Sequence, residues 1–257
     1  MKKIILFIAI AAITSGVFAQ TANTWRLGVH FTGINNPSNY SGGSSDANAL
    51  FNQHDFNSGA LGLTWRYYVN EHWSLQSGLG FGDLGFEFAM AKDYSLLDRT
   101  GQYAVNRAGI GMAQIPLTVL YDFKPNCNNV HFFVGAGISV LQRLNSSEQT
   151  VNTTPNAETP ISPSVPYMNQ TVSSGNSTSL TGQFMFGLEK NLKHGGMVQV
   201  GLVFNKGTAD IASTTVNYSV NGTAYSHSFT NRGDYWGLTL GYYFKEHSKI
   251  VKGQSAQ

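Results

Sequence analysis

The sequence predicts an all-β fold, an eight-stranded antiparallel up-and-down transmembrane β-barrel, and three observations lead to it. The segment 233–244 alternates large apolar residues with glycine, threonine and tyrosine, so one face of an extended strand is apolar. Similar segments recur along the chain, and the connections between them alternate between long and short. Glycine (28 residues) and aromatic residues (12%) are both abundant, as expected when glycines let a narrow barrel close and aromatics line its interfaces.

The alternating segments define eight strands, each long enough for the ~9–11 residues that cross a bilayer. They are residues 25–34, 56–68, 73–86, 109–123, 130–141, 180–190, 196–205 and 233–244. We expect the short connections and both chain ends on the periplasmic side, and the long loops outside. The alternative fold is a soluble all-β sandwich, in which the apolar faces pack against each other.

Two strands depart from strict alternation. The parity of the third strand changes near Asp83, which predicts a bulge or the exit from the membrane. Pro116 interrupts the fourth strand, and because proline cannot donate a ladder hydrogen bond we expect a bulge there as well. Ile110 and Met112, whose parity is opposite to that of the later apolar residues, support this interpretation.

The long connections cover residues 35–53, 87–107 and 142–179, and polar residues dominate them. The last of them is rich in Asn, Ser and Thr and holds four prolines, so we expect it to bury no core and to be mobile. Residues 215–229 alternate around Asn221-Gly222, a dipeptide that favours a type I′ turn. The seventh and eighth strands should therefore extend past the membrane as a hairpin tipped by Asn221 and Gly222.

The chain starts with two lysines, an apolar run and small residues before Gln20, which is typical of a cleavable secretory signal peptide. The apolar run is too short for a membrane anchor of ~20 residues. We predict a signal peptide (1–19), an outer-membrane barrel (20–245) and a periplasmic tail (246–257). Export through this peptide should deliver the protein to the outer membrane.

Charge and cysteine content exclude several function classes. Removal of Lys2 and Lys3 lowers Lys plus Arg from 16 to 14, against 14 Asp plus Glu. A neutral chain offers no electrostatic basis for nucleic-acid binding. Cys127 is the only cysteine, so it forms no internal disulfide, and no metal site or cofactor is predicted.

Inward-facing charges gather near the short-turn end of the predicted barrel and should meet in one layer of the lumen. These residues are Arg26, Arg66, Asp122, His131 and Glu189. Because an unpaired buried charge is costly, we expect them to pair. The cluster is interpreted as a structural plug, and the alternative is a gate that opens a narrow pore.

Aromatic residues at strand ends map to one membrane interface and predict an aromatic belt. They are Trp25, Trp65, Tyr67, Trp73, Tyr121 and Tyr242.

Three pairs could carry hydrolytic chemistry, because nucleophile, base and acid must lie within hydrogen-bond reach. They are His54 with Asp55, His72 with Ser74, and His227 with Ser228. Adjacent strand residues face opposite sides, so ordinary polar loop chemistry explains each pair better and we predict no enzyme.

The chain resembles the small outer-membrane β-barrel family, the PorT-like or porin-like domain of Gram-negative envelopes. The resemblance rests on four segments, residues 115–117 with Tyr121, 133–137, 186–189 and 238–244. It implies an eight-stranded barrel without catalytic residues. Such barrels often end on their final aromatic residue, whereas this chain continues through residues 245–257.

The function expected from these patterns is non-enzymatic: envelope structure, surface adhesion, or service to a secretion or assembly complex through the outward loops. We expect a monomer in outer-membrane lipid, with envelope proteins as partners of the loops and no nucleic acid. Two alternatives remain, a narrow channel for small solutes and a lipid-A-modifying barrel enzyme.

Overall fold

The computed structural model describes residues 24–37, 39–43, 51–91, 103–123, 130–144, 149–153, 167–193, 195–220, 223–245 and 247–248. The predicted signal peptide, Cys127 and the Asn221-Gly222 hairpin tip lie outside these residues. Among the described residues no helix is long and apolar enough to span a membrane.

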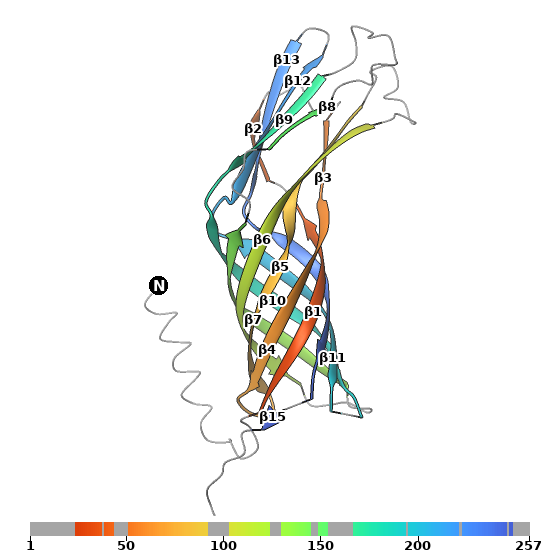
Figure 1. Cartoon of the computed structure of the whole chain (residues 1–257), viewed down its shortest axis with the longest axis vertical. Helices are drawn as coiled ribbons and strands as arrows, with labels where there is room; N and C mark the ends of the chain where they lie inside the picture. Colours follow the sequence, from red (N-terminus) through yellow and green to blue (C-terminus); the bar gives the residue numbers. More distant parts are fainter. Residues whose placement is uncertain are drawn as a thin grey trace, which may run out of the picture.

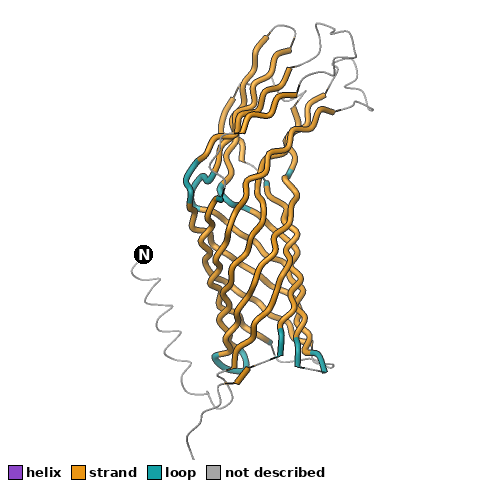
Figure 2. Tube along the Cα trace, in the orientation of Figure 1, coloured by secondary structure: helices purple, strands orange, loops and turns teal. Residues whose placement is uncertain are grey.

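Eight long strands form a closed antiparallel barrel (Figures 1 and 2). They are β1 (Thr24–Asn36), β4 (Phe56–Tyr68), β5 (Trp73–Ala91), β6 (Tyr103–Asp122), β7 (Val130–Arg143), β10 (Thr178–Asn191), β11 (Met197–Gly207) and β14 (Tyr235–Tyr243). Each pairs with the next along the chain, and β14 pairs back onto β1 to close the ring. The predicted fold class is confirmed.

The apolar face of every barrel strand points outward. Leu61 and Leu63 on β4 are 66% and 64% exposed, and Leu238 and Leu240 on β14 are 57% and 55% exposed. Tyr243, at the opposite parity of β14, is fully buried. A sandwich would bury the leucines between its sheets, so this alternative is wrong, and the outward band suits hydrocarbon.

Neither Asp83 nor Pro116 lies at a bulge, so the bulge predicted at Pro116 is wrong, and of the two alternatives at Asp83 only the exit from the membrane stays a prediction. The β5–β6 register runs unbroken through Asp83, which pairs with Gly111, and the β6–β7 register runs through Pro116, which pairs with Ser139. The parity of the apolar residues changes because several of them turn inward at the long-loop end. Leu84, Phe86, Ala108, Ile110 and Met112 are buried there.

Three of the predicted loops contain strands. β5 and β6 run on through the predicted connection 87–107 to Ala91 and from Tyr103, and β3 (Phe51–His54) pairs with the far end of β5. Beyond the barrel mouth lies a second sheet of five strands, in the order β2, β13, β12, β9, β8 (Figure 1). Their bounds are β2 (Asn39–Gly43), β8 (Gln149–Thr153), β9 (Tyr167–Ser174), β12 (Ala212–Val220) and β13 (Thr223–Asn231).

The expectation that residues 142–179 bury no core is therefore wrong for β9, where Val172 is buried and the backbone pairs with both β12 and β8. Its alternating Thr, Val and Ser residues suit a pleated surface once neighbouring strands are present. A hairpin is present where it was predicted, because β12 and β13 pair up to Val220 and Thr223. It is not an extension of the seventh and eighth strands, since β11 ends at Gly207, β14 begins at Tyr235, and β12 and β13 belong to the second sheet.

The chain after β14 does not leave the barrel at once. Phe244 N donates a hydrogen bond to Leu27 O at 2.8 Å. A two-residue strand, β15 (His247–Ser248), then pairs with Trp25 and Thr24 at the beginning of β1. Residues within the predicted tail thus complete the seam between the first and last strands.

Candidate functional site: the filled lumen and the sheet above it

An Arg-centred cluster crosses the lumen near the short-turn end. Arg66, on β4, is fully buried and donates through Nη2 to both carboxylate oxygens of Asp122 on β6, at 2.8 and 2.7 Å. Its Nη1 pairs with Glu189 on β10, and its Nε donates to Ser74 Oγ at 2.8 Å. Gln199 Nε2 donates to Glu189 at 2.8 Å. The guanidinium therefore has a partner at each of its three nitrogens, and these charge-assisted hydrogen bonds hold it in one position.

Arg26 and His131 lie beside this cluster, outside the Arg66 ion pairs. The Arg26 guanidinium lies 5.9 Å from the Tyr68 ring centre and donates to Gly195 O at 3.3 Å. The His131 ring is 3.0 Å from Asn191 Nδ2. Both line a cup of about 320 Å³ that opens at the short-turn end, and Asp122 and Glu189 are in its wall.

A layer of amides lies above the charges. Tyr243 Oη donates to Gln76 at 2.9 Å, and Tyr235 Oη donates to Gln114 at 2.7 Å. The chamber that this layer lines has a volume of only about 50 Å³, which is room for a few water molecules. Sequence reasoning missed these glutamines, although Gln76 and Gln114 share the inward parity of their strands.

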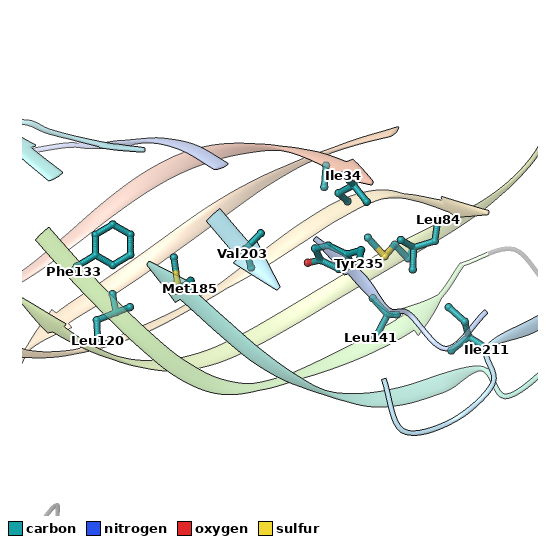
Figure 3. Packing of buried hydrophobic residues seen from close by; sticks show 11 residues of the cluster. Ile34, Leu84, Leu120, Phe133, Leu141, Met185, Val203, Ile211 and Tyr235 are labelled. Atoms are coloured by element: carbon teal, nitrogen blue, oxygen red, sulfur yellow. The ribbon is translucent and has the colours of Figure 1, made fainter. Parts of the chain in front are cut away.

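Apolar side chains fill the rest of the lumen (Figure 3). Leu120 and Phe133 are fully buried between the charged cluster and the chamber. Toward the long-loop end these apolar side chains continue as a cap of fully or almost fully buried residues. The cap contains Ile34, Leu84, Met112, Leu141 and Ile211. The lumen is therefore blocked on both sides of the chamber.

Two buried asparagines join the barrel to the second sheet. Asn231, at the end of β13, donates to Asn36 Oδ1 at 2.6 Å and to Gly85 O at 3.0 Å. Asn36, at the end of β1, donates to Asp234 O and accepts from Gly85 N at 3.0 Å. Both asparagines are fully buried, so the junction is a satisfied polar network rather than a loose linker.

Asp234 also braces the point at which the hairpin leaves the barrel. Its carboxylate pairs with Lys206 on β11 and accepts from Gly207 N at 2.7 Å. The Arg232–Asp210 pair, at 2.7 Å, links the two connections above it. β11 and β14 are thus tied together directly beneath the second sheet.

The family model of the outer membrane protein beta-barrel domain matches residues 18–190 of this chain. The chain belongs to this family. An outer-membrane location follows, so the short turns face the periplasm and the second sheet is extracellular.

The chain is also similar, at low identity, to solved structures of outer-membrane proteins. The outer membrane protein OprG from Pseudomonas aeruginosa is 13% identical over 87% of this chain and 97% of its own, with a TM-score of 0.43. Neisserial surface protein A is 13% identical over 86% and 96%, with a TM-score of 0.40. The outer membrane protein AlkL is 14% identical over 91% and 94%, with a TM-score of 0.42. A comparison with curated proteins finds no match.

The aromatic residues proposed for the belt lie at the periplasmic end of this outer-membrane barrel. Trp73 packs edge-on against Tyr121, with ring centres 4.9 Å apart, and Trp65 stacks on Tyr67 at 6.2 Å. Tyr242 packs against Phe244 at 5.4 Å, and Trp25 pairs with Tyr67 across the β1–β4 ladder. Sequence reasoning missed Phe123 and Phe132, which extend the row at 5.3 Å.

The histidine pairs considered for catalysis take separate partners. His72 Nδ1 lies 2.9 Å from Asp122 O, whereas Ser74 Oγ accepts from Arg66. His227 is buried on the inner face of β13. Ser228 faces outward, 3.5 Å from Thr215 Oγ1.

The third pair is described only in part. Asp55 is exposed, and His54 belongs to β3, where only its backbone is described. Among the described residues no group of three acidic, histidine or cysteine side chains could hold a metal ion.

Proposed function

We propose that this outer-membrane barrel is a non-enzymatic surface protein whose activity resides in its extracellular sheet, as an adhesive or structural element of the envelope. The proposal rests on the contrast between the filled lumen of the barrel and the second sheet outside it. The lumen is filled by the Arg66 cluster and by an apolar cap, whereas the extracellular strands form a second sheet of five strands. Binding on a rigid scaffold commonly resides in such outer segments.

The finer parts of the proposal come from the sequence. The chain is exported through its signal peptide (1–19) into a Gram-negative envelope. It stays a monomer in outer-membrane lipid and offers its extracellular strands to envelope proteins, including those of a secretion or assembly complex.

Excision of the β12–β13 hairpin tests the proposal. Replacing residues 209–232 by a short turn should leave the barrel folded, because β11 and β14 pair directly along Met197–Asn205. Attachment of expressing cells to a surface, or co-purification of envelope partners, should be lost. Folding is verified by the shift in gel mobility that a closed barrel shows between unheated and boiled samples. Full attachment by a folded, hairpin-less variant would refute the proposal.

A narrow channel is the second candidate, and one observation favours it. The cup of about 320 Å³ at the periplasmic mouth reaches Asp122 and Glu189, which both bind Arg66. If this cluster rearranged, an opening would form at that end. We expect no single-channel steps from the purified protein in planar bilayers, because the apolar cap still blocks the outer end. Regular conductance steps would favour the channel.

A further inference from the structure

Hydroxyl and amide side chains dominate the outward face of the extracellular sheet. Along β9, β12 and β13 the described side chains at this parity are Ala224 and eight polar residues, Thr171, Ser173, Ser213, Thr215, Asn217, Ser226, Ser228 and Thr230. We call these eight residues the hydroxyl face. The register aligns them in rows, with Thr215 between Thr171 and Ser228, and Ser213 between Ser173 and Thr230.

The side chains on the opposite face of the same strands are buried. Gln170 and Val216 are fully buried, and Thr214, His227 and Phe229 are at most 4% exposed. By contrast Asn217 and Ser226 are exposed, and the other members of the hydroxyl face are half-buried between their neighbours. The hydroxyl face is therefore the side of this sheet that meets the surroundings.

The hydroxyl face continues the lipid-facing surface of the barrel. On β14 the outward residues Trp236, Leu238 and Leu240 are exposed, and on β13 Ser226, Ser228 and Thr230 face outward. The alternation is broken between the two strands, where Gly233 has a positive φ and Asp234 is buried. On the inner side Asn231 leads to the buried junction over the barrel mouth. The hydroxyl face thus looks sideways, directly above the apolar band.

The chemistry of the outward surface changes at the membrane boundary. Below it the outward side chains on β14 are Trp236, Leu238, Leu240 and Tyr242, and above it no member of the hydroxyl face is charged, aromatic or aliphatic. The hydroxyl face offers an anionic partner no cation, and it offers an apolar partner only the neighbouring methyl group of Ala224. Hydroxyl and amide groups donate and accept hydrogen bonds, which suits a ligand that itself bears many hydroxyl groups.

We propose that the hydroxyl face binds the uncharged sugar chains of glycolipid in the outer leaflet that surrounds the barrel. This proposal rests on the proposed function, because it names the ligand of the same extracellular sheet. The position of the hydroxyl face identifies this ligand. The apolar band of the barrel contacts the acyl chains of the surrounding lipid, so the hydroxyl face directly above it lies beside the saccharide part of the same lipid molecules. Adjacent strands lie ~4.8 Å apart, and outward residues repeat every ~6.8 Å along a strand. The face therefore presents a regular grid of hydrogen-bonding groups.

Hydrogen exchange of the full-length protein in vesicles tests the proposal. One set of vesicles contains smooth lipopolysaccharide and the other contains lipid A alone, which keeps the acyl chains and phosphates but lacks the sugar chain. A ligand that binds the closed sheet stabilises it against local opening. Amides of β12 and β13 should exchange at least fivefold more slowly with the smooth form than with lipid A.

The double variant Thr215→Ala/Ser228→Ala removes two hydroxyls from the middle row. We expect it to lose the protection, because each hydrogen bond removed weakens binding by about fivefold. The matched control, Thr24→Ala/Ser77→Ala, removes the same two side-chain types near the periplasmic end and should keep the protection. The gel-mobility shift on heating verifies that both variants are folded.

The possible results separate this proposal from the proposed function. Equal exchange in the two vesicle types, or protection that the double variant retains, overturns glycolipid binding. If excision of the hairpin still abolishes attachment in that case, the sheet acts on a different partner and the proposed function stands. Attachment that survives the excision refutes the proposed function whatever the exchange rates are.

Discussion

Arg66 satisfies two carboxylates at once, and this arrangement decides what its removal would do. Strand alternation places Arg66, Asp122 and Glu189 inside the barrel from the sequence alone. Their positions near the short turns also predicted that they meet in one layer of the lumen. Which cation binds which carboxylate could not be predicted, because it depends on the stagger of β4, β6 and β10 around a closed ring. Parity likewise indicated the inward glutamines, but their tyrosine partners come from strands far apart in the sequence.

Arg66→Ala should lower the free energy of unfolding by about 3–5 kcal/mol, because both carboxylates would stay buried without their cation. The unfolding midpoint in urea, followed by the gel-mobility shift, measures this. Adding Asp122→Asn and Glu189→Gln to the variant should restore part of the loss, since the uncompensated charges disappear. An unchanged midpoint for Arg66→Ala alone would contradict a buried, paired cluster.

Gly78 and Gly80 both face the lumen from β5, yet their surroundings differ. A Cβ at Gly80 would have no neighbour closer than 3.8 Å, whereas a Cβ at Gly78 would lie 2.3 Å from Leu63 O. Gly80→Ala should therefore change the unfolding free energy by less than about 1 kcal/mol. Gly78→Ala should cost about 1–3 kcal/mol through overpacking. Urea unfolding of the two variants side by side gives the answer, and equal midpoints would contradict the difference in space.

At the level of secondary-structure elements, the alternation of apolar and polar residues predicted the barrel strands but not the strands beyond the barrel mouth. Period-two alternation located all eight barrel strands because lipid and lumen select opposite chemistries on opposite faces. The alternation gave wrong predictions at the extracellular mouth, where the outward face no longer meets lipid. Leu84 and Met112 suggested bulges because apolar residues were assumed to face lipid, whereas at the extracellular mouth they face the core. The polar strand β9 carries little apolar signal, and its neighbours β8 and β12 are distant in sequence.

The short strand β15 gives the tail a measurable role. Deleting residues 246–257 should expose the beginning of β1, because Thr24 and Trp25 would lose their partners Ser248 and His247. Leu27 O accepts from Phe244 N, so the odd-numbered residues of β1 point their N–H groups toward β14 and β15. The Trp25 amide should therefore exchange faster, while those of residues 28–35, which pair with β14, should not change. Unaltered exchange at the start of β1 would show that the tail does not hold the seam.

The inner face of β13 gives the extracellular sheet a pH dependence. Burial lowers the pKa of His227 below its usual ~6.5, because the charged imidazole would lose solvation. The unfolded sheet therefore binds a proton more readily than the folded one, and stability is full above pH ~6.5. It falls as the pH drops from there to the folded-state pKa. Hydrogen exchange of β12 and β13 at pH 7.5 and 5.5 measures the loss, and His227→Gln should reduce the dependence.

At the scale of the whole molecule, the barrel and the extracellular sheet are separate hydrogen-bonded sheets joined through Asn36 and Asn231. The closed barrel was predictable, since eight alternating strands with alternating connections have few other arrangements. The second sheet was not, because its strands come from three different connections and no local pattern shows that they pair. The filled lumen follows from the small number of strands.

Asn231→Ala should uncouple the two sheets. The substitution removes the side-chain donor to the buried Gly85 O and one of the two donors to Asn36 Oδ1, at a cost of about 1–3 kcal/mol. Exchange should accelerate in β12 and β13 while the membrane strands remain protected. The control is Asn217→Ala, which removes an exposed amide from the same sheet. A uniform acceleration across the barrel, or none at all, would contradict a local junction.

The brace formed by Lys206, Gly207 and Asp234 has a consequence for protein engineering. It ties β11 to β14 below the point at which the β12–β13 hairpin departs, so the far end of the hairpin can be changed without altering the ring of membrane strands. A foreign peptide inserted between Val220 and Thr223 would be displayed on the cell exterior, while Ile211 and Asn231 keep their places in the cap and the junction.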